Sequence, residues 1–242
     1  MAAVKSWGYQ LSELDLEAAL RSPFDLLVVD ATTGLRGNIG FTAEQVARLK
    51  RKPDGSRRLV VSYLSIGEAE DYRTGYFDKE YMSEEAPDWL LELGFDGVYL
   101  DRVDVYAEVR SQCPSAADKA VAFVERLADH ARKRNPRFLV ILQNAEELLR
   151  HKVMVDAIDA VAKEDLVHSP DDSGRLNPES EFRDIVANLN LAKTAGRTVL
   201  VVDYPRSRSG ADHARQRIEA KGFIPYVAPR NLDALRLPGV DY

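Results

Sequence analysis

The sequence has almost no cysteine. Of its 242 residues only Cys113 carries a thiol, so the chain can form neither an internal disulfide nor a cysteine-based metal site. Cys113 precedes Pro114 and is predicted to lie in a loop. The fold must therefore depend on a hydrophobic core, which a chain of this length can bury.

Long apolar runs are also missing. No stretch reaches the length that spans a membrane, and the N-terminal residues MAAVKSWGYQL lack the apolar segment of a signal peptide. The sequence therefore predicts a soluble protein without a membrane partner. As written it would be cytoplasmic, and it would be secreted if a signal peptide had been removed.

An excess of positive charge is absent as well. The chain has 33 basic and 39 acidic side chains, a net charge of −6, and its Lys and Arg residues are scattered along the sequence. Nucleic acid is therefore not expected as a partner. The sequence does not indicate an oligomeric state.

Several catalytic motifs are lacking. No GxGxxG or GxxxxGK[ST] run follows a predicted strand, which argues against a nucleotide-binding fold, and no GxSxG run suggests a serine hydrolase. The histidines do not gather at a strand end, so we interpret them as residues outside any site: His130, His151, His168 and His213. We expect neither a cofactor nor a bound metal.

The sequence does have a regular alternation of short, apolar, β-rich runs with helical patterns. The predicted strands are residues 7–11, 25–30, 59–66, 97–101, 138–143, 157–162, 198–203 and 223–227. The predicted helices are residues 42–50, 83–93, 115–134, 145–152, 179–195 and 210–221. Gly94, Gly196 and Gly222 follow three of these helices, where a positive φ would close the last turn. Thr42 and Ser115 are placed to cap helix N-termini.

Eight such units predict an α/β protein with a single (β/α)8 TIM barrel over residues 1–242. In this fold the active site lies where the strands end. The polar residues at those ends are Asp30, Glu68, Glu70, Asp101, Asp104, Gln143, Asn144, Glu146, Glu147, Glu164, Asp165, Asp203 and Tyr204. Each acid alone could be a helix cap or a solvated loop charge, but capping does not require so many acids at one rim.

Clustered carboxyl groups without histidine favour two kinds of chemistry. Two carboxyl groups flanking one bond, one protonated and one ionised, are typical of glycoside hydrolysis. A magnesium site is the other reading, because Mg²⁺ also prefers oxygen ligands. It would need phosphate-binding glycines or basic residues nearby, and the sequence offers no convincing set.

Four stretches of the sequence resemble glycoside hydrolase family 114. They are WGYQL at 7–11, DLLVVD at 25–30, YLSIGEAEDYR at 63–73 and GFDGVYLDRVD at 94–104. The resemblance extends from Trp7 to about Asn231, and the family contains endo-α-1,4-polygalactosaminidases. It implies an endo-acting glycosidase, of EC 3.2.1 type, for an α-linked polysaccharide in which galactosamine is a candidate sugar.

The resemblance also implies roles for residues. Asp101 and Glu164 match the catalytic pair, one as the general acid and the other as nucleophile or base. The implied or candidate substrate-binding residues are Tyr9, Asp30, Tyr63, Glu68, Glu70, Arg73, Asp104, Asn144, Glu147, Asp203 and Tyr204. Arg73 could instead orient Glu70 or Asp101 as an ion-pair partner.

One departure from the family concerns the loop after the third strand. Family members carry a long segment there that overhangs the cleft, whereas residues 72–94 form only a short connection here. Two alternative functions therefore stay open. One is a carbohydrate-binding pseudoenzyme with the same barrel, which would bind without cleaving; the other is a metal-dependent hydrolase or lyase, which a chelator would inactivate.

Overall fold

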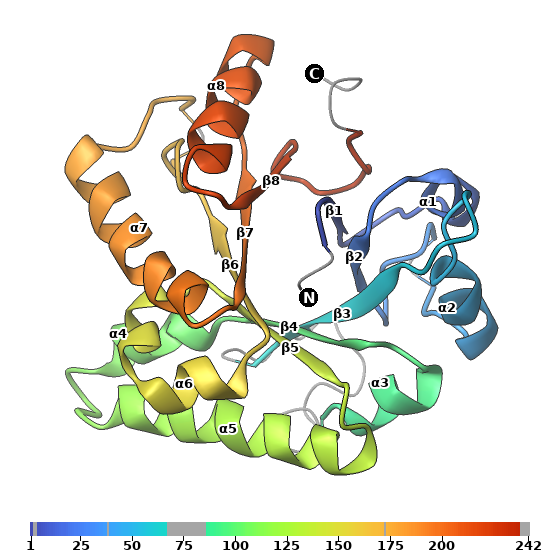
Figure 1. Cartoon of the computed structure of the whole chain (residues 1–242), viewed down its shortest axis with the longest axis horizontal. Coiled ribbons are helices and arrows are strands. Elements are labelled where there is room, and N and C mark those ends of the chain that lie inside the picture. The colour runs from blue at the N-terminus through green and yellow to red at the C-terminus, as the bar shows by residue number, and fades with distance from the viewer. Residues whose placement is uncertain (2–3, 38, 67–85, 172, 238–242) are drawn as a thin grey trace.

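The computed structural model describes residues 1, 4–37, 39–66, 86–171 and 173–237. Within them, eight parallel strands are hydrogen-bonded in sequence order and curve into a nearly closed barrel (Figure 1). The strands are β1 (Trp7–Gln10), β2 (Leu26–Asp30), β3 (Leu59–Ser65), β4 (Gly97–Asp101), β5 (Leu139–Gln143), β6 (Ala160–Glu164), β7 (Thr198–Asp203) and β8 (Ile224–Val227). The predicted (β/α)8 barrel is confirmed.

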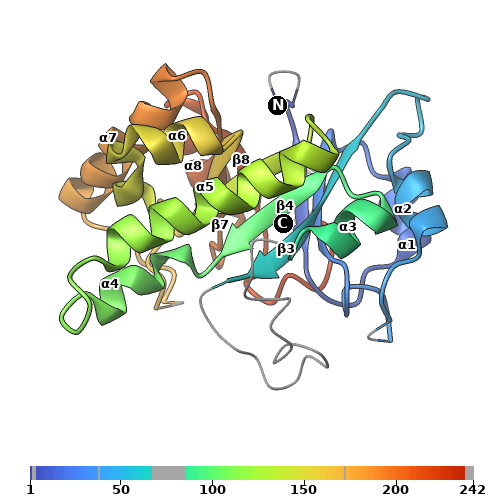
Figure 2. The same cartoon turned by 90° about the horizontal axis from the view of Figure 1, so that it is seen from below.

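Helices cover the outside of this barrel. The α-helices are α1 (Leu16–Arg21), α2 (Ala43–Leu49), α3 (Asp88–Leu93), α4 (Tyr106–Val109), α5 (Ala116–Arg134), α6 (Lys152–Ala157), α7 (Glu179–Thr194) and α8 (Arg208–Glu219). Two 3₁₀ helices, η1 (Val103–Val105) and η2 (Glu146–Arg150), follow β4 and β5. Figure 2 shows α5 lying across the outside of β4. Among the described helices, none combines the length and apolar character needed to cross a bilayer.

The predicted helix-end positions are confirmed. Gly94, Gly196 and Gly222 have φ values of 85°, 77° and 69°, as helix termination requires. Thr42 forms a capping box with Gln45. Ser115 is the N-cap residue of α5, but its hydroxyl makes no cap hydrogen bond and lies 3.6 Å from the Cys113 Sγ.

The segment between β5 and β6 differs most from its prediction. A helix was expected over 145–152 and a strand over 157–162, but the chain forms η2, breaks at His151, and then forms α6 as far as Ala157. The break has a local cause, because His151 has an extended backbone with ψ of 115°. As a result β6 starts at Ala160, and Glu164 is its last residue rather than a residue of the following loop.

The barrel interior contains a cluster of aromatic rings. Trp7 and Tyr9 of β1 stack on each other at 5.9 Å, and Tyr9 lies 5.0 Å from Tyr99 of β4. Tyr226 of β8 lies 5.6 Å from Trp7. Since these strands stand around the barrel and the four rings are buried, the rings must fill its centre. Consecutive side chains alternate between this interior and the helices outside.

A buried arginine ties the first two helices to the barrel. Arg58 precedes β3 and is fully buried, and its guanidinium donates only to backbone carbonyl groups. The acceptors are the carbonyl oxygens of Phe24 at 3.0 Å, Ala19 at 2.9 Å and Leu49 at 3.1 Å, together with that of Ser22. Leu49 is the last residue of α2, and the Ala19 carbonyl near the end of α1 also accepts from the backbone N–H and hydroxyl of Ser22, so one side chain contacts the C-terminal parts of both helices.

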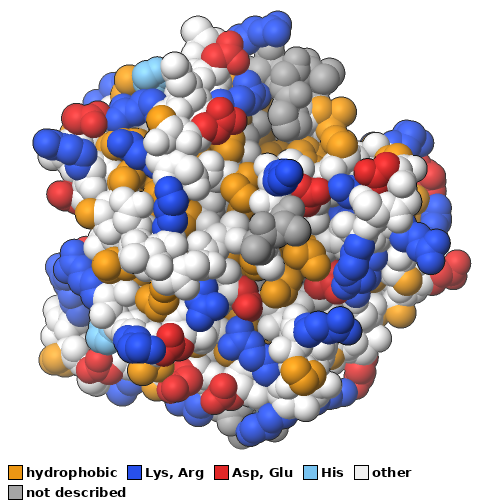
Figure 3. Space-filling view, viewed as in Figure 1, with side chains coloured by type: hydrophobic (Ala, Val, Ile, Leu, Met, Phe, Trp, Pro, Cys, Tyr) orange, Lys and Arg blue, Asp and Glu red, His pale blue; other side chains and the backbone are white. Residues whose placement is uncertain are grey.

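The surface carries both signs of charge. On the face seen in Figure 3, Lys and Arg side chains are interspersed with Asp and Glu over most of the molecule. Many of these charges are paired at the surface, as in Arg48 with Glu17 at 2.8 Å. Such exposed pairs contribute little to stability, so the core remains the main source of it.

Candidate active site

The strand pleat brings Asp101 and Glu164 into the mouth of the barrel. Asp101 ends β4 two residues after the interior Tyr99, so both side chains lie on the inner face. Glu164 ends β6, and only β5 stands between these two strands. Both carboxyl groups are half-buried at the carboxyl ends of the strands, where barrel enzymes bind substrate.

The Asp101 carboxylate is held by two donors. The Tyr63 hydroxyl donates to its Oδ2 at 2.6 Å, and the backbone N–H of Arg102 donates to its Oδ1 at 2.7 Å. Tyr63 comes from β3, the neighbouring strand, where Ser65 rather than Tyr63 is the register partner of Asp101. Because Tyr63 lies two residues before Ser65, its side chain extends from deeper in the barrel, and its hydroxyl fixes the orientation of the Asp101 carboxyl group.

The Glu164 carboxylate has a similar setting. The Tyr204 hydroxyl donates to its Oε1. The backbone N–H of Glu164 donates to the Asn144 Oδ1 at 3.1 Å, and the Lys163 Nζ donates to the same oxygen at 3.1 Å. Asn144 thus orients the end of β6 through its side-chain oxygen.

Burial raises the pKa of both candidate carboxyl groups. For Asp101, hydrogen bonds from Tyr63 and Arg102 oppose the rise and the nearby Asp104 adds to it. For Glu164, the Tyr204 hydrogen bond opposes the rise in pKa, and the charges of Asp101 and Asp165 add to it. The charge of Asp101 is therefore close enough to contribute to the raised pKa of Glu164.

Three buried phenols surround the pair and remain protonated. Burial is the first cause that raises the pKa of Tyr9, Tyr99 and Tyr204, and the charge of Glu164 adds to each rise. The Tyr9 hydroxyl also lies 3.5 Å from the Gln143 Oε1. These side chains supply hydrogen-bond donors at the floor of the mouth.

Left-handed backbone conformations are concentrated at this rim. Arg102 follows β4 with φ of 60°, Asn144 and Ala145 follow β5 with φ of 53° and 51°, and Asp165 follows β6 with φ of 55°. A non-glycine residue in this region carries strain of order 1–3 kcal/mol, which is common at functional sites. The strain occurs directly after the two candidate acids and after Gln143.

Two predicted substrate-binding acids have their oxygens engaged within the protein. Asp30 accepts hydrogen bonds from the backbone and side chain of Thr32 at 2.8 and 2.7 Å, which shapes the turn after β2. Asp203 is fully buried and lies on the outer pleat of β7, where it accepts from Val167 N at 2.7 Å and pairs with His168 at 2.5 Å. His168 lies in the loop after β6, as the sequence predicts, and its ring is buried against Asp203.

The other candidates lie at different depths. Tyr9 and Tyr63 are buried beneath the two acids, whereas Glu147 is exposed, with the Tyr106 hydroxyl 3.5 Å from its Oε2. Asp104 lies in η1, close enough to Asp101 to raise the pKa of that group. Glu68, Glu70 and Arg73, like most of the shortened 72–94 connection, lie outside the described residues.

Sequence reasoning missed three residues around the site. Tyr99 could have been found by counting in steps of two along β4, because it shares the inner face with Asp101. Lys163 and Arg230 carry no such signal. Lys163 contacts Asn144 from the next strand, and Arg230 binds Asp165 from the loop after β8.

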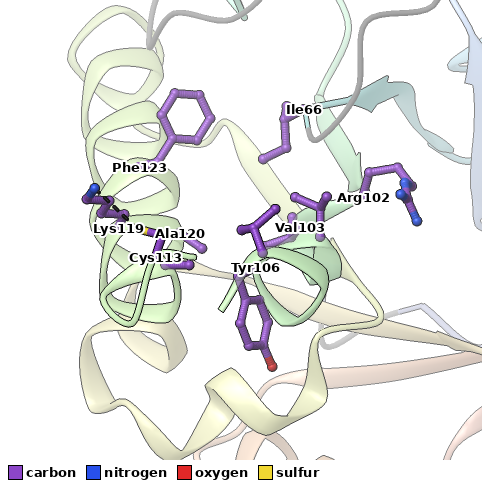
Figure 4. Close-up of a pocket in the computed structure, with 11 residues that line it drawn as sticks. Ile66, Arg102, Val103, Tyr106, Cys113, Lys119, Ala120 and Phe123 are labelled. Carbon is purple, nitrogen blue, oxygen red and sulfur yellow. Dashed lines mark hydrogen bonds between the residues drawn. The ribbon is translucent and has the colours of Figure 1, made fainter. Parts of the chain in front are cut away.

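An apolar cleft of about 280 Å³ lies beside the rim and contains neither candidate acid (Figure 4). Ile66, Val103 and Tyr106 line it on one side, and Ala120 and Phe123 of α5 on the other. Among the described residues that line it, none has a carboxyl group. In the described part of the chain, no group of three or more His, Cys, Asp or Glu side chains is arranged to hold a metal ion.

Sequence comparison finds relatives across nearly the whole chain. The profile of glycoside-hydrolase family GH114 matches residues 88–238, which include both candidate acids. An uncharacterized protein of Deinococcus radiodurans is 32% identical over 271 residues, covering 98% of this chain and 84% of the relative. An uncharacterized protein of Methanocaldococcus jannaschii is 30% identical over 275 residues, covering 95% of this chain and 77% of the relative. Both alignments exceed the 242 residues of this chain, so both relatives have residues that it lacks.

Solved structures share the fold. The glycoside hydrolase domain of PelA from Pseudomonas aeruginosa superposes with a TM-score of 0.71 at 21% identity, covering 96% of this chain and 97% of that domain. A GH18 chitinase from Pseudoalteromonas aurantia gives a TM-score of 0.52 at 16% identity, covering 84% of this chain and 81% of the chitinase chain. At these identities the likeness shows the barrel architecture.

Proposed function

Since the chain belongs to glycoside-hydrolase family GH114, we propose that it is an endo-acting glycosidase in which Asp101 and Glu164 cleave an α-linked polysaccharide. The observation that supports this most directly is the setting of the two acids. Both end barrel strands, both are half-buried, and burial raises the pKa of each. A raised pKa keeps a carboxyl group protonated to higher pH, which suits the general acid that glycoside hydrolysis requires.

The residues around the acids fit roles in such a reaction. One acid protonates the leaving oxygen of the glycosidic bond, and the other acts on the anomeric carbon directly or through water. The hydrogen bonds from Tyr63 to Asp101 and from Tyr204 to Glu164 fix the direction of each carboxyl group. Asn144, held by its oxygen, presents its amide nitrogen as a donor for a sugar hydroxyl.

The charge of the rim supports an amino sugar as the substrate unit. Asp101, Asp104, Glu147 and Glu164 gather at the carboxyl ends of the strands, and Asp165 nearby is paired with Arg230. An ammonium group on the sugar would be attracted to these acids. We therefore propose a galactosamine-containing, partly deacetylated chain as the substrate.

A product screen tests this function. The protein is incubated with partly deacetylated galactosaminan and, separately, with neutral α-glucans, and the products are sized by mass spectrometry. Oligosaccharides of several lengths from galactosaminan alone would agree with the proposal. Binding of that polymer without any product would identify a carbohydrate-binding pseudoenzyme, and products from the glucan alone would overturn the choice of sugar.

We expect the activity to survive exhaustive treatment with EDTA. The proposed chemistry uses carboxyl groups for both proton transfer and attack, so removal of divalent ions should change the rate by less than about twofold. The measurement is the rate of product formation before and after dialysis against EDTA. A loss of activity that Mg²⁺, Mn²⁺ or Zn²⁺ restores would instead indicate a metal-dependent hydrolase or lyase.

A further inference from the structure

Arg230 makes two well-defined contacts at the edge of the site. Its Nη2 lies 2.6 Å from the Asp165 Oδ1 and its Nη1 lies 3.0 Å from the Oδ2, which is a two-bond fork between guanidinium and carboxylate. The same guanidinium lies over the Tyr204 ring, with its carbon 4.4 Å from the ring centre. The fork fixes the plane of the guanidinium, and the ring contact fixes its position.

Both partners of Arg230 act directly on Glu164. The Tyr204 hydroxyl donates to the Glu164 carboxylate, and Tyr204 itself is buried, with 4% of its surface exposed. Asp165 follows Glu164 in the chain and holds a left-handed φ of 55°. The Asn177 side chain donates to the Asp165 carbonyl oxygen at 2.7 Å, so the turn is fixed from a second side.

We propose that Arg230 is a positioning residue for Glu164. Through Tyr204 it holds the direction of the carboxyl group, and through Asp165 it holds the strained turn from which that carboxyl projects. This role deepens the proposed function, because it assigns to a residue of the loop after β8 the placement of one of the two acids. Arg230 itself is not placed against the scissile bond.

The positive charge of Arg230 has a second effect on Glu164. The titratable and charged groups around Glu164 come from several elements: Tyr9 of β1, Tyr99 and Asp101 of β4, Asp165 after β6, Tyr204 after β7, and Arg230. Arg230 is the cation among these groups. It favours the ionised form of Glu164 and compensates Asp165, so its removal should raise the pKa of Glu164 further.

The chain contains a matched arginine far from the site. Arg217 of α8 also combines an ion pair with a ring contact, lying 2.6 Å from Glu179 and 3.8 Å from the centre of the Phe182 ring. Neither partner touches Glu164. The variant Arg217→Met therefore removes the same kinds of contact as Arg230→Met while leaving the site alone.

The test is a titration of Glu164 that needs no substrate. The side-chain carboxyl carbon of Glu164 is followed by ¹³C NMR over pH in the whole protein, and its resonance is identified by its loss in Glu164→Gln. We expect Arg230→Met to raise the titration midpoint of Glu164 by about one pH unit, as loss of a nearby opposite charge does. Arg217→Met should leave this midpoint unchanged, although both variants should lower the melting temperature by similar amounts.

An unchanged midpoint in Arg230→Met, or an equal shift in Arg217→Met, would overturn the proposal. Should Arg230→Met fail to fold, Arg230→Gln is titrated in its place and decides by the same criterion. Because this result is independent of any sugar, it can fail while the proposed function stands, or hold while that function fails. Once a substrate is found, Arg230→Met should lower kcat with KM changed less than about twofold, whereas a sugar-binding arginine would mainly raise KM.

Discussion

Replacement of Asp101 by Asn or of Glu164 by Gln is expected to reduce turnover by at least about 10²–10⁴-fold, because each change removes a group that transfers a proton or attacks the sugar. Neither variant should unfold earlier. Burial raises the pKa of both carboxyl groups in the folded protein, so the stability that they contribute is present below their unfolded pKa values. It is lost as the pH rises through the raised folded values.

At pH 7 a neutral amide at either position therefore costs the fold little and relieves repulsion between the two acids. The check is to measure kcat and the melting temperature of each variant at pH 7. We expect a melting temperature equal to that of the unchanged protein, or slightly higher. Wild-type turnover combined with earlier unfolding in both variants would show that these are structural acids.

Asp203→Asn provides the contrast for this experiment. Its carboxylate is fully buried and accepts the backbone N–H of Val167 at 2.7 Å and the ring nitrogen of His168 at 2.5 Å. This substitution should lower the melting temperature by several degrees, because the buried groups that are hydrogen-bonded to the carboxylate would lose a well-matched partner. The folded fraction should retain its turnover, because this carboxylate lies on the outer pleat of β7.

Replacement of Arg58 by Met is expected to reduce the free energy of unfolding by about 3–5 kcal/mol, because it leaves buried polar groups without partners. Four carbonyl groups would lose their hydrogen bonds from the guanidinium, and that of Ala19 would keep only its hydrogen bonds from Ser22. Arg58→Lys should also destabilise the protein, since an ammonium group has three donors and lacks the planar geometry that reaches all four oxygens. Urea unfolding measures both effects.

Arg36→Met is the control for Arg58. The Arg36 side chain is 67% exposed and lies 3.7 Å from Asp15, so its loss should change the free energy of unfolding by less than about 0.5 kcal/mol. If Arg58→Met were to unfold within about 1 kcal/mol of the unchanged protein, water must replace the guanidinium at the four carbonyl groups. The interpretation of Arg58 as the tie between helices and barrel would then be wrong.

The barrel could be predicted because its signal is local and repeated. Each strand is a short apolar run. Gly94, Gly196 and Gly222 mark helix ends because each adopts a positive φ there, and this requirement depends only on residues nearby in the sequence. The error between β5 and β6 arose where apolar periodicity is ambiguous. The apolar run near Ala157 fits the pattern of a helix and also that of a strand. Because the chain breaks at His151, a new helix starts after it and continues to Ala157.

The site could be predicted only in part, because much of it depends on contacts between distant residues. The strand-end rule locates Asp101 and Glu164, and strict alternation along β7 would have turned Asp203 away from the cleft. The pairing of Arg230 with Asp165 joins residues 65 positions apart, and no periodicity encodes it. Arg58 is similar, because its four acceptors come from two separate segments, residues 19–24 and Leu49, that meet only in the folded chain.

The aromatic side chain at the start of the barrel has a consequence for how the protein is made. Trp7 of β1 donates its indole N–H to the Ile224 carbonyl oxygen of β8 at 3.0 Å, and residues 217 positions apart thereby meet at the seam of the sheet. During synthesis β1 is the first of the eight strands to leave the ribosome, and β8, its partner across the seam, is the last of them. Until then the nascent sheet has a free edge, which invites pairing with other chains. Closure of the seam is thus the step that converts an association-prone sheet into a finished barrel.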